Sequence, residues 1–114
     1  MTMRVKMIRA IIRPECEEAV LKNLEEIDLY AITKTPVLGR GQQRGVQVGP
    51  IRYDALAKLT LLLVVEEKDY PGAIEAIERG ASTGHPGDGK IFVQEVSQVY
   101  TVRTGAKATE ETVS

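Results

Sequence analysis

The sequence of 114 residues is short enough for one domain, and its hydrophobic content of 43% suits a globular protein with a modest core. A formal net charge of −1 provides no strong field to attract nucleic acid or an anionic membrane, so no direct nucleic-acid binding is expected. The single cysteine, Cys16, excludes an intramolecular disulfide and suits a reducing compartment. The N-terminal residues lack the long apolar core of a signal peptide, and a cytoplasmic protein is expected.

The first third of the chain predicts a strand, a helix and a second strand. Residues 7–12 are apolar apart from Arg9 and predict a short strand. Pro14 suits the first turn of a helix, where its missing N–H group is harmless. Residues 31–38 contain several β-branched side chains and predict the second strand. One face of the helix is expected to pack on a sheet, because four apolar side chains recur at helical spacing: Cys16, Val20, Leu24 and Ile27.

The middle of the chain predicts a buried strand, a second helix and a last strand. Residues 59–65 are almost continuously apolar, which is typical of a central, well-covered strand. Asp69 is placed to cap a helix, and residues 91–93 predict the fourth strand. The buried face of this second helix is expected to carry Ile74, Ile77 and Ala81. The resulting order βαββαβ predicts an α+β fold of the ferredoxin-like type, with an antiparallel four-stranded sheet and the helices on one face.

A glycine-rich segment separates the second helix from the last strand. Residues 83–93 read Thr-Gly-His-Pro-Gly-Asp-Gly-Lys-Ile-Phe-Val. Glycine permits positive φ and can present consecutive N–H groups to an anion, and Lys90 adds a positive charge. A P-loop is excluded, because Ile91 stands where the metal-binding Ser or Thr belongs and because here a helix precedes the loop and a strand follows it. A phosphate-binding loop of another kind is therefore predicted at residues 83–90.

A long connection, residues 39–58, joins the second and third predicted strands. It contains four glycines and Pro50 and shows no clear periodicity. Such a connection inside a compact domain is usually functional or disordered. Its composition leaves two interpretations open, a solvent-exposed flexible hairpin or a loop that engages ligands and partners. The small and polar residues 106–114 predict a mobile tail.

Four motifs together resemble the PII signal-transduction proteins. The pattern Thr-x-x-x-Gly-Asp-Gly-Lys-Ile-Phe at residues 83–92 closely resembles the family signature, and residues 7–14 are similar to its first strand and helix start. Residues 39–45 resemble the entry to its mobile T-loop, and residues 103–105 resemble its C-terminal nucleotide contact. The resemblance implies a single PII-like domain over residues 1–114, a T-loop at about 39–58, and a homotrimer with ligands in clefts between subunits.

The same resemblance implies ATP or ADP as ligand, Mg²⁺ as cofactor and 2-oxoglutarate as effector. Lys58 would pair with the distal carboxylate of 2-oxoglutarate, and Gln43 would give its amide oxygen to Mg²⁺ as a metal ligand. Thr33 and Arg103 would reach the nucleotide across a subunit boundary. The implied ATP or ADP contacts are Thr33, Gly39, Gly41, Gln42, Val64, Gly87, Asp88, Gly89, Lys90 and Arg103. The implied 2-oxoglutarate contacts are Arg13, Gly41, Gln43, Arg44, Gly45 and Lys58.

Three positions depart from the usual pattern of the family. Thr101 replaces the first arginine of an Arg-x-Arg pair, so one phosphate contact is absent. Gln42 occupies a position that is usually basic, and Leu62 stands where many relatives carry a glutamate that contacts adenine. Because each change removes a polar or charged contact, weaker ATP binding or an altered discrimination between ATP and ADP is expected.

The T-loop is shorter than in the common branch of the family by about four residues, within the tolerance of surface loops. A short loop with an intact phosphate segment resembles the nitrogenase-associated branch. There the protein acts with a second PII paralogue and binds dinitrogenase to switch nitrogen fixation off. The alternative within the family is a general nitrogen sensor that regulates an ammonium channel or glutamine synthetase.

Two other classes of function remain as alternatives to a nucleotide-binding sensor. An enzyme is not expected, because the sequence offers no nucleophile–base pair: Cys16 falls on the predicted buried face, and His85 is the only histidine. The phosphate loop argues against a nucleotide-independent ferredoxin-like interaction module. A protein that binds no nucleotide would favour that alternative again.

Overall fold

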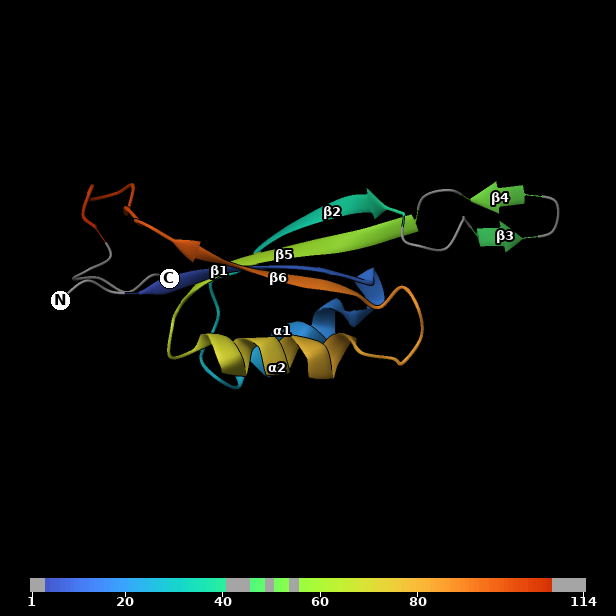
Figure 1. Ribbon diagram of the computed structural model, residues 1–114, viewed down its shortest axis with the longest axis horizontal. Coiled ribbons are helices and arrows are strands. Elements are labelled where there is room, and N and C mark those ends of the chain that lie inside the picture. Colours follow the sequence, from blue (N-terminus) through green and yellow to red (C-terminus); the bar gives the residue numbers. More distant parts are fainter. Residues whose placement is uncertain (1–3, 41–45, 49–50, 54–55, 108–114) are drawn as a thin grey trace.

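The computed structural model describes residues 4–40, 46–48, 51–53 and 56–107. Four strands form one sheet in the order β2-β5-β1-β6, and all neighbouring strands are antiparallel (Figure 1). They are β1 (Val5–Ile12), β2 (Thr33–Gly39), β5 (Leu56–Glu66) and β6 (Gly89–Val96). Together with two helices this is the ferredoxin-like βαββαβ fold, so the predicted fold class is confirmed.

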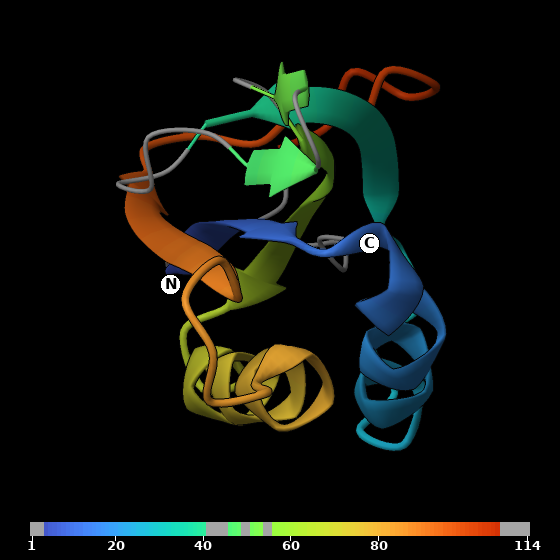
Figure 2. The ribbon, with the colours of Figure 1, turned by 90° about the vertical axis from the view of Figure 1, so that its right-hand side faces the viewer.

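Both helices cover one face of the sheet (Figure 2). The first begins with a 3-10 turn, η1 (Pro14–Cys16), and continues as α1 (Glu17–Glu25); the second is α2 (Tyr70–Ala81). The two helices approach each other closely at Gly80, where an added Cβ atom would lie 2.8 Å from the Val20 backbone nitrogen. Close packing of the helix pair therefore depends on glycine at this position.

The core lies between the sheet and the helices. Alternate side chains of β1 and β5 point into it, as the period of a strand requires, and Ile8 and Leu61 are fully buried there. Val20 and Leu24 from α1 and Ile77 from α2 close the core from the helix side. All the buried side chains of the described residues are apolar, so burial of aliphatic surface is the main stabilising term.

The other face of the sheet is not covered by either helix, and we call it the open face (Figure 2). Residues paired across antiparallel strands lie on the same face, and here they alternate with the core positions. Phe92 on β6 is 49% exposed on this face, opposite Arg9. Further apolar members of the open face, by register with these two, are Met7, Ile11, Leu62 and Val64.

The connection over residues 39–58 is shorter and more regular than predicted. β5 already begins at Leu56, and a separate antiparallel pair lies within the connection: β3 (Val46–Val48) and β4 (Ile51–Tyr53). Apolar residues in these short strands alternate with Gln47 and Arg52, a period-2 pattern typical of strands, whereas no periodicity was predicted for this connection. The β3–β4 hairpin projects beyond the end of the sheet formed by β2 and β5 (Figure 1).

Two predicted details of the helices were wrong. Ile27 is 43% exposed instead of buried, because α1 ends at Glu25 and the chain reverses at Asp28, which has a φ of 62°. The Asp69 side chain makes no capping hydrogen bond; only its backbone carbonyl accepts from the N–H of Ala73, at 3.0 Å. None of the helices in the described part of the chain is long and apolar enough to span a membrane.

The C-terminal half of the sheet also differs from the prediction at its boundaries. β6 begins at Gly89, so Gly89 and Lys90 belong to a strand and the connecting loop proper is residues 82–88. Within the tail predicted from residue 106, Lys107 forms an isolated antiparallel bridge with Tyr100. The rest of that predicted tail, residues 108–114, lies outside the described residues.

Candidate phosphate-binding site

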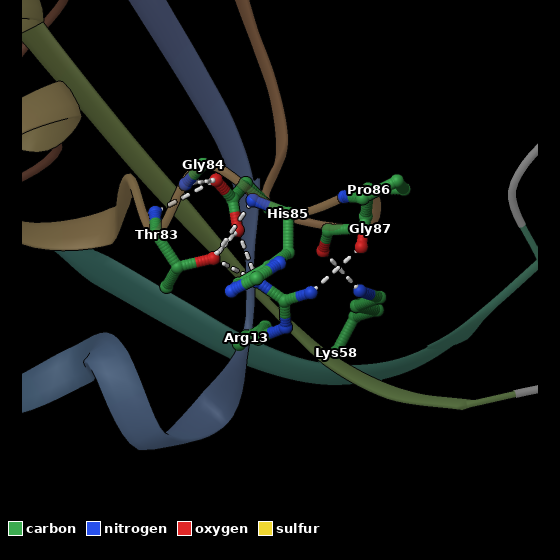
Figure 3. Close-up of polar contacts among 8 residues, drawn as sticks. Arg13, Lys58, Thr83, Gly84, His85, Pro86 and Gly87 are labelled. Atoms are coloured by element: carbon green, nitrogen blue, oxygen red, sulfur yellow. Dashed lines mark hydrogen bonds and ion pairs between the residues drawn. The ribbon is translucent and has the colours of Figure 1, made fainter.

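The glycine-rich loop lies at the end of the sheet from which the β3–β4 hairpin projects (Figure 1). It connects the C-terminus of α2 to the start of β6. Arg13 immediately follows β1, and Lys58 is near the start of β5. Both cationic side chains extend toward the loop from the neighbouring strands (Figure 3). The sheet thus brings three separate segments of the chain together at one end.

The carboxylate of Asp88 is the centre of the hydrogen bonds inside this loop. One of its oxygens, Oδ2, accepts from the backbone N–H groups of Thr83 at 2.7 Å and of Gly84 at 3.0 Å. The other, Oδ1, accepts from the Thr83 hydroxyl at 2.5 Å and from the guanidinium of Arg13. The bonds from Thr83, and then the one from Arg13, hold the pKa of Asp88 well below its ordinary value. Asp88 is therefore ionised, and both of its carboxylate oxygens are bound by donors of the protein.

The two cations also bind backbone carbonyl groups of the loop. The Nη2 of Arg13 donates to the carbonyl of Pro86 at 2.8 Å, and its Nη1 also donates to the Thr83 hydroxyl at 3.1 Å. The ammonium of Lys58 donates to the carbonyl of Gly87 at 2.6 Å (Figure 3). The guanidinium is mostly covered, with 22% of the Arg13 side chain exposed. Two consecutive carbonyls of the loop are thus held by cations.

The backbone of the loop requires glycine at two positions. Gly87 has a φ of 95°, and a Cβ atom there would lie 3.1 Å from the Arg13 guanidinium. Gly89 has a φ of 118°, and a Cβ atom there would lie 1.8 Å from the Ile11 carbonyl oxygen. Both φ values fall in the region that side chains disfavour, as the sequence predicted for a phosphate-binding loop.

The chemistry of this loop fits a phosphate group. A glycine cradle that a Cβ atom would fill lies next to the Lys58 ammonium, which is 3.7 Å from the position of such an atom at Gly87. Lys90 is exposed on β6, one residue beyond Gly89. The Asp88 carboxylate, the one anion in the loop, is already paired with Arg13 and does not leave an unbalanced negative charge to repel a phosphate.

Other predicted nucleotide contacts lie far from this loop in the same chain. Val64 is six residues along β5 from Lys58, a separation of about 20 Å along the strand. Thr33 pairs with Leu62 in the same half of the sheet. Arg103 lies in a turn closed by a hydrogen bond from the N–H of residue 101 to the carbonyl of residue 106. The segment that follows β6 lies at the opposite end of the sheet from the phosphate loop (Figure 1). One chain by itself does not bring these residues to the phosphate loop.

The predicted effector contacts divide into two groups. Arg13 and Lys58 meet at the phosphate loop. Gly39, a predicted nucleotide contact, lies beside Lys58, where a Cβ atom would be 3.1 Å from the lysine Cγ. The remaining predicted residues of this region lie outside the described residues: Gly41, Gln42, Gln43, Arg44 and Gly45. The predicted Mg²⁺ ligand is among them, and no cluster of metal-binding side chains is found in the parts of the chain that the structure describes.

Thr83 opens the predicted phosphate loop, but its hydrogen bonds to Asp88 were not predicted. Its five-residue separation from Asp88 was the available signal, since a short polar side chain can bond a nearby carboxylate and close a turn. The pairing of Arg13 with Asp88 had no such signal, because 75 positions separate the two residues. His85 is exposed, and its backbone N–H donates to the Thr83 hydroxyl at 3.3 Å.

Comparisons with known proteins agree with the fold and with the motif. The family described as "Nitrogen regulatory protein P-II" matches residues 5–106. A nifHD2 region GlnB-like protein of Methanosarcina barkeri is 45% identical over 103 residues, which are 90% of this chain and 98% of the relative. A nifHD region glnB-like protein of Methanococcus maripaludis is 49% identical over 100 residues, 88% of this chain and 95% of the relative.

Solved structures show the same fold at lower identity. Arabidopsis thaliana PII bound to citrate superposes with a TM-score of 0.78 and is 32% identical, over 96% of this chain and 89% of that one. The ATP complex of B. subtilis GlnK has a TM-score of 0.77 and is 30% identical, over 94% of both chains. The chain therefore belongs to the P-II family of nitrogen regulatory proteins, which are signalling proteins and not enzymes, and it lies in the nitrogenase-associated branch of that family.

Proposed function

We propose that this protein senses nucleotide and carbon status, and that it regulates a target of nitrogen metabolism through the segment of residues 39–58. ATP or ADP would bind at the loop of residues 82–88 and the start of β6. With Mg²⁺ and ATP present, 2-oxoglutarate would bind beside Lys58. The observation that carries this proposal is the glycine loop bound by Arg13 and Lys58, with its single carboxylate already paired with Arg13.

Different predicted residues would bind the nucleotide and 2-oxoglutarate. Gly87, Gly89 and Lys90 would contact the phosphates through backbone N–H groups and an ammonium. Lys58 would exchange the Gly87 carbonyl for a carboxylate of 2-oxoglutarate, a stronger, charge-assisted partner. Gln43 would supply the amide oxygen for Mg²⁺, the metal that joins ATP to the effector. The relatives described as bound to ATP and to citrate, a polycarboxylate, support these two ligand classes.

A homotrimer is part of the proposal. Apolar residues on the open face have no covering helix, and Phe92 is 49% exposed there, so self-association would remove this surface from water. Thr33 and Arg103 lie at the far end of their own sheet from the phosphate loop. They would complete a nucleotide site only if a neighbouring copy supplies them, which supports ligand clefts between subunits.

The target that we propose is the dinitrogenase component of nitrogenase, with a second PII paralogue as a further partner. The names of the Methanosarcina and Methanococcus relatives place those proteins in nifHD regions, and this supports the assignment. The free thiol of the buried Cys16 and the predicted metabolite ligands fit a cytoplasmic protein. The ligand would act by population shift, since it binds one shape of the 39–58 segment better than another.

Calorimetric titration of 2-oxoglutarate into the purified protein, with and without Mg-ATP, tests the sensor. Binding that requires Mg-ATP is the expected result, and binding of neither ligand would return the chain to a nucleotide-independent interaction module. Sedimentation tests the trimer. Inhibition of purified nitrogenase, relieved by ATP and 2-oxoglutarate, tests the target. If the protein does not inhibit nitrogenase but binds an ammonium channel or glutamine synthetase, a general nitrogen sensor would instead be favoured.

A further inference from the structure

Arg13 is bound to the phosphate loop by each of the hydrogen bonds that the structure gives its side chain. Its guanidinium contacts the Asp88 carboxylate, the Thr83 hydroxyl and the Pro86 carbonyl. The resemblance to PII proteins had placed Arg13 at the effector. We propose instead that Arg13 is a positioning residue for the phosphate loop, which sets the direction of the backbone N–H groups that meet the anion. This inference rests on nucleotide binding at the loop.

The planarity of the peptide unit links the direction of each loop carbonyl to that of the next N–H group. In a trans peptide the C=O and the following N–H point in opposite directions. Arg13 draws the Pro86 carbonyl toward itself, and Lys58 draws the Gly87 carbonyl toward its ammonium. The N–H groups of Gly87 and Asp88, which complete the same two peptide units, are therefore turned away from the two cations. Consecutive N–H groups that are turned to one side form an anion-binding concavity.

The other half of the loop cannot serve in the same way. The N–H groups of Thr83 and Gly84 already donate to the Asp88 carboxylate. Arg13 keeps that carboxylate in place and cancels its charge. Loss of Arg13 would therefore release the Pro86 carbonyl and leave an unbalanced anion beside the phosphates. Both changes would weaken phosphate binding although Arg13 does not touch the ligand.

A direct contact between Arg13 and a phosphate is the rival explanation. It would require the guanidinium to give up its charge-assisted bonds to a carboxylate, a hydroxyl and a carbonyl. The fork of donors in arginine matches this set of acceptors, whereas lysine offers a single point charge. Replacement by lysine should therefore rescue the charge of the site without rescuing both loop contacts.

The test is calorimetric titration of ATP, of tripolyphosphate and of adenosine into wild-type protein and into Arg13→Ala, Arg13→Lys and Arg79→Ala. Arg79 lies on α2 with exposed ion pairs to glutamates and serves as the matched control. In Arg13→Ala, affinity for ATP and tripolyphosphate should fall on the order of tenfold to a hundredfold, with adenosine unchanged. Arg13→Lys should recover part of this loss, and Arg79→Ala should match wild type.

A second measurement separates positioning from direct contact. If Arg13 acts through Asp88, the losses in Arg13→Ala and Asp88→Asn should be strongly non-additive in the double variant, whereas additive losses would indicate direct contact and overturn the inference. Amide NMR shifts give a ligand-free readout: Arg13→Ala should move the Gly84 and Gly87 resonances and leave Gly72 in place. Unmoved loop resonances, or ATP affinity equal to wild type in Arg13→Ala, would also overturn it. A wild-type protein that binds no ATP would instead refute the proposed function.

Discussion

Replacing Gly89 by alanine is expected to be the most damaging single methyl addition in the site. Gly89 starts β6, pairs with Ile12 of the central strand, and has a φ of 118°. An alanine Cβ in the present backbone would lie 1.8 Å from the Ile11 carbonyl oxygen. Because the obstacle is a backbone atom of β1, no side-chain rotation can relieve the overlap.

The cost can be assembled from two terms. A side-chain-bearing residue in this region of φ costs on the order of 1–3 kcal/mol. Moving the start of β6 away from β1 to relieve the overlap loses ladder hydrogen bonds worth about 1 kcal/mol each. With one or two hydrogen bonds lost, the backbone and hydrogen-bond terms sum to about 2–5 kcal/mol. This is a large fraction of the roughly 5–15 kcal/mol that stabilises a typical domain.

Urea unfolding followed by circular dichroism measures this cost, with all variants at one protein concentration because self-association shifts the midpoint. Gly72→Ala is the matched control, since its Cβ would meet only the Ile27 side chain, at 3.6 Å, inside a helix. It should gain about 0.5–1 kcal/mol. If the free energy of unfolding of Gly89→Ala lies within about 0.5 kcal/mol of the wild-type value, β1 and β6 do not approach each other this closely.

Four further substitutions test other parts of the structure. Gly80→Ala should lose about 1–2 kcal/mol in the same unfolding assay, because overpacking against the Val20 backbone outweighs the gain in helix propensity, and a net gain would contradict the close helix contact. Lys58→Ala should abolish the 2-oxoglutarate response in calorimetry and reduce ATP affinity less than loss of Arg13; an unchanged 2-oxoglutarate affinity would refute the assignment. Lys90→Ala should weaken ATP binding on the order of tenfold, and equal affinity would count against the phosphate cradle. Because folding lowers the pKa of Asp88 from its unfolded value near 3.8, the ionised carboxylate stabilises the fold at pH values above 3.8. This stabilisation is lost as the pH falls through the folded pKa. Asp88→Asn should therefore flatten the acid side of the stability–pH profile, and an unchanged profile would exclude this linkage.

The fold could be predicted from the sequence because local pattern and global arrangement agree. The uninterrupted apolar run of residues 59–65 is the centre of β5, and the predicted burial of Val20, Leu24 and Ile77 is confirmed. The ends of strands were predicted less accurately where pairing with a neighbouring strand extends them. β6 reaches back to Gly89, a residue with no β propensity of its own, because β1 offers hydrogen-bond partners there.

The residue types of the candidate site could be predicted from the sequence, but the hydrogen bonds between them could not. Positive φ at Gly87 and Gly89 follows from residue type, and the structure confirms it. The hydrogen bonds of Arg13 and Lys58 to the loop depend on which strand ends meet at one end of the sheet, and no local pattern encodes that. Ligand contacts of Thr33 and Arg103 stay a prediction, since one chain holds them apart from the loop.

The central position of β1 has a consequence for how the chain acquires its structure. This strand is synthesised before its partners β5 and β6, whose residues follow it by about fifty and eighty positions. Its two edges therefore stay unpaired until most of the chain has been made, and the sheet cannot close from the N-terminus alone. Unpaired edges of apolar strands are prone to wrong pairing with other nascent chains. Slow or interrupted translation after β1 should therefore favour aggregation more than an interruption after β6.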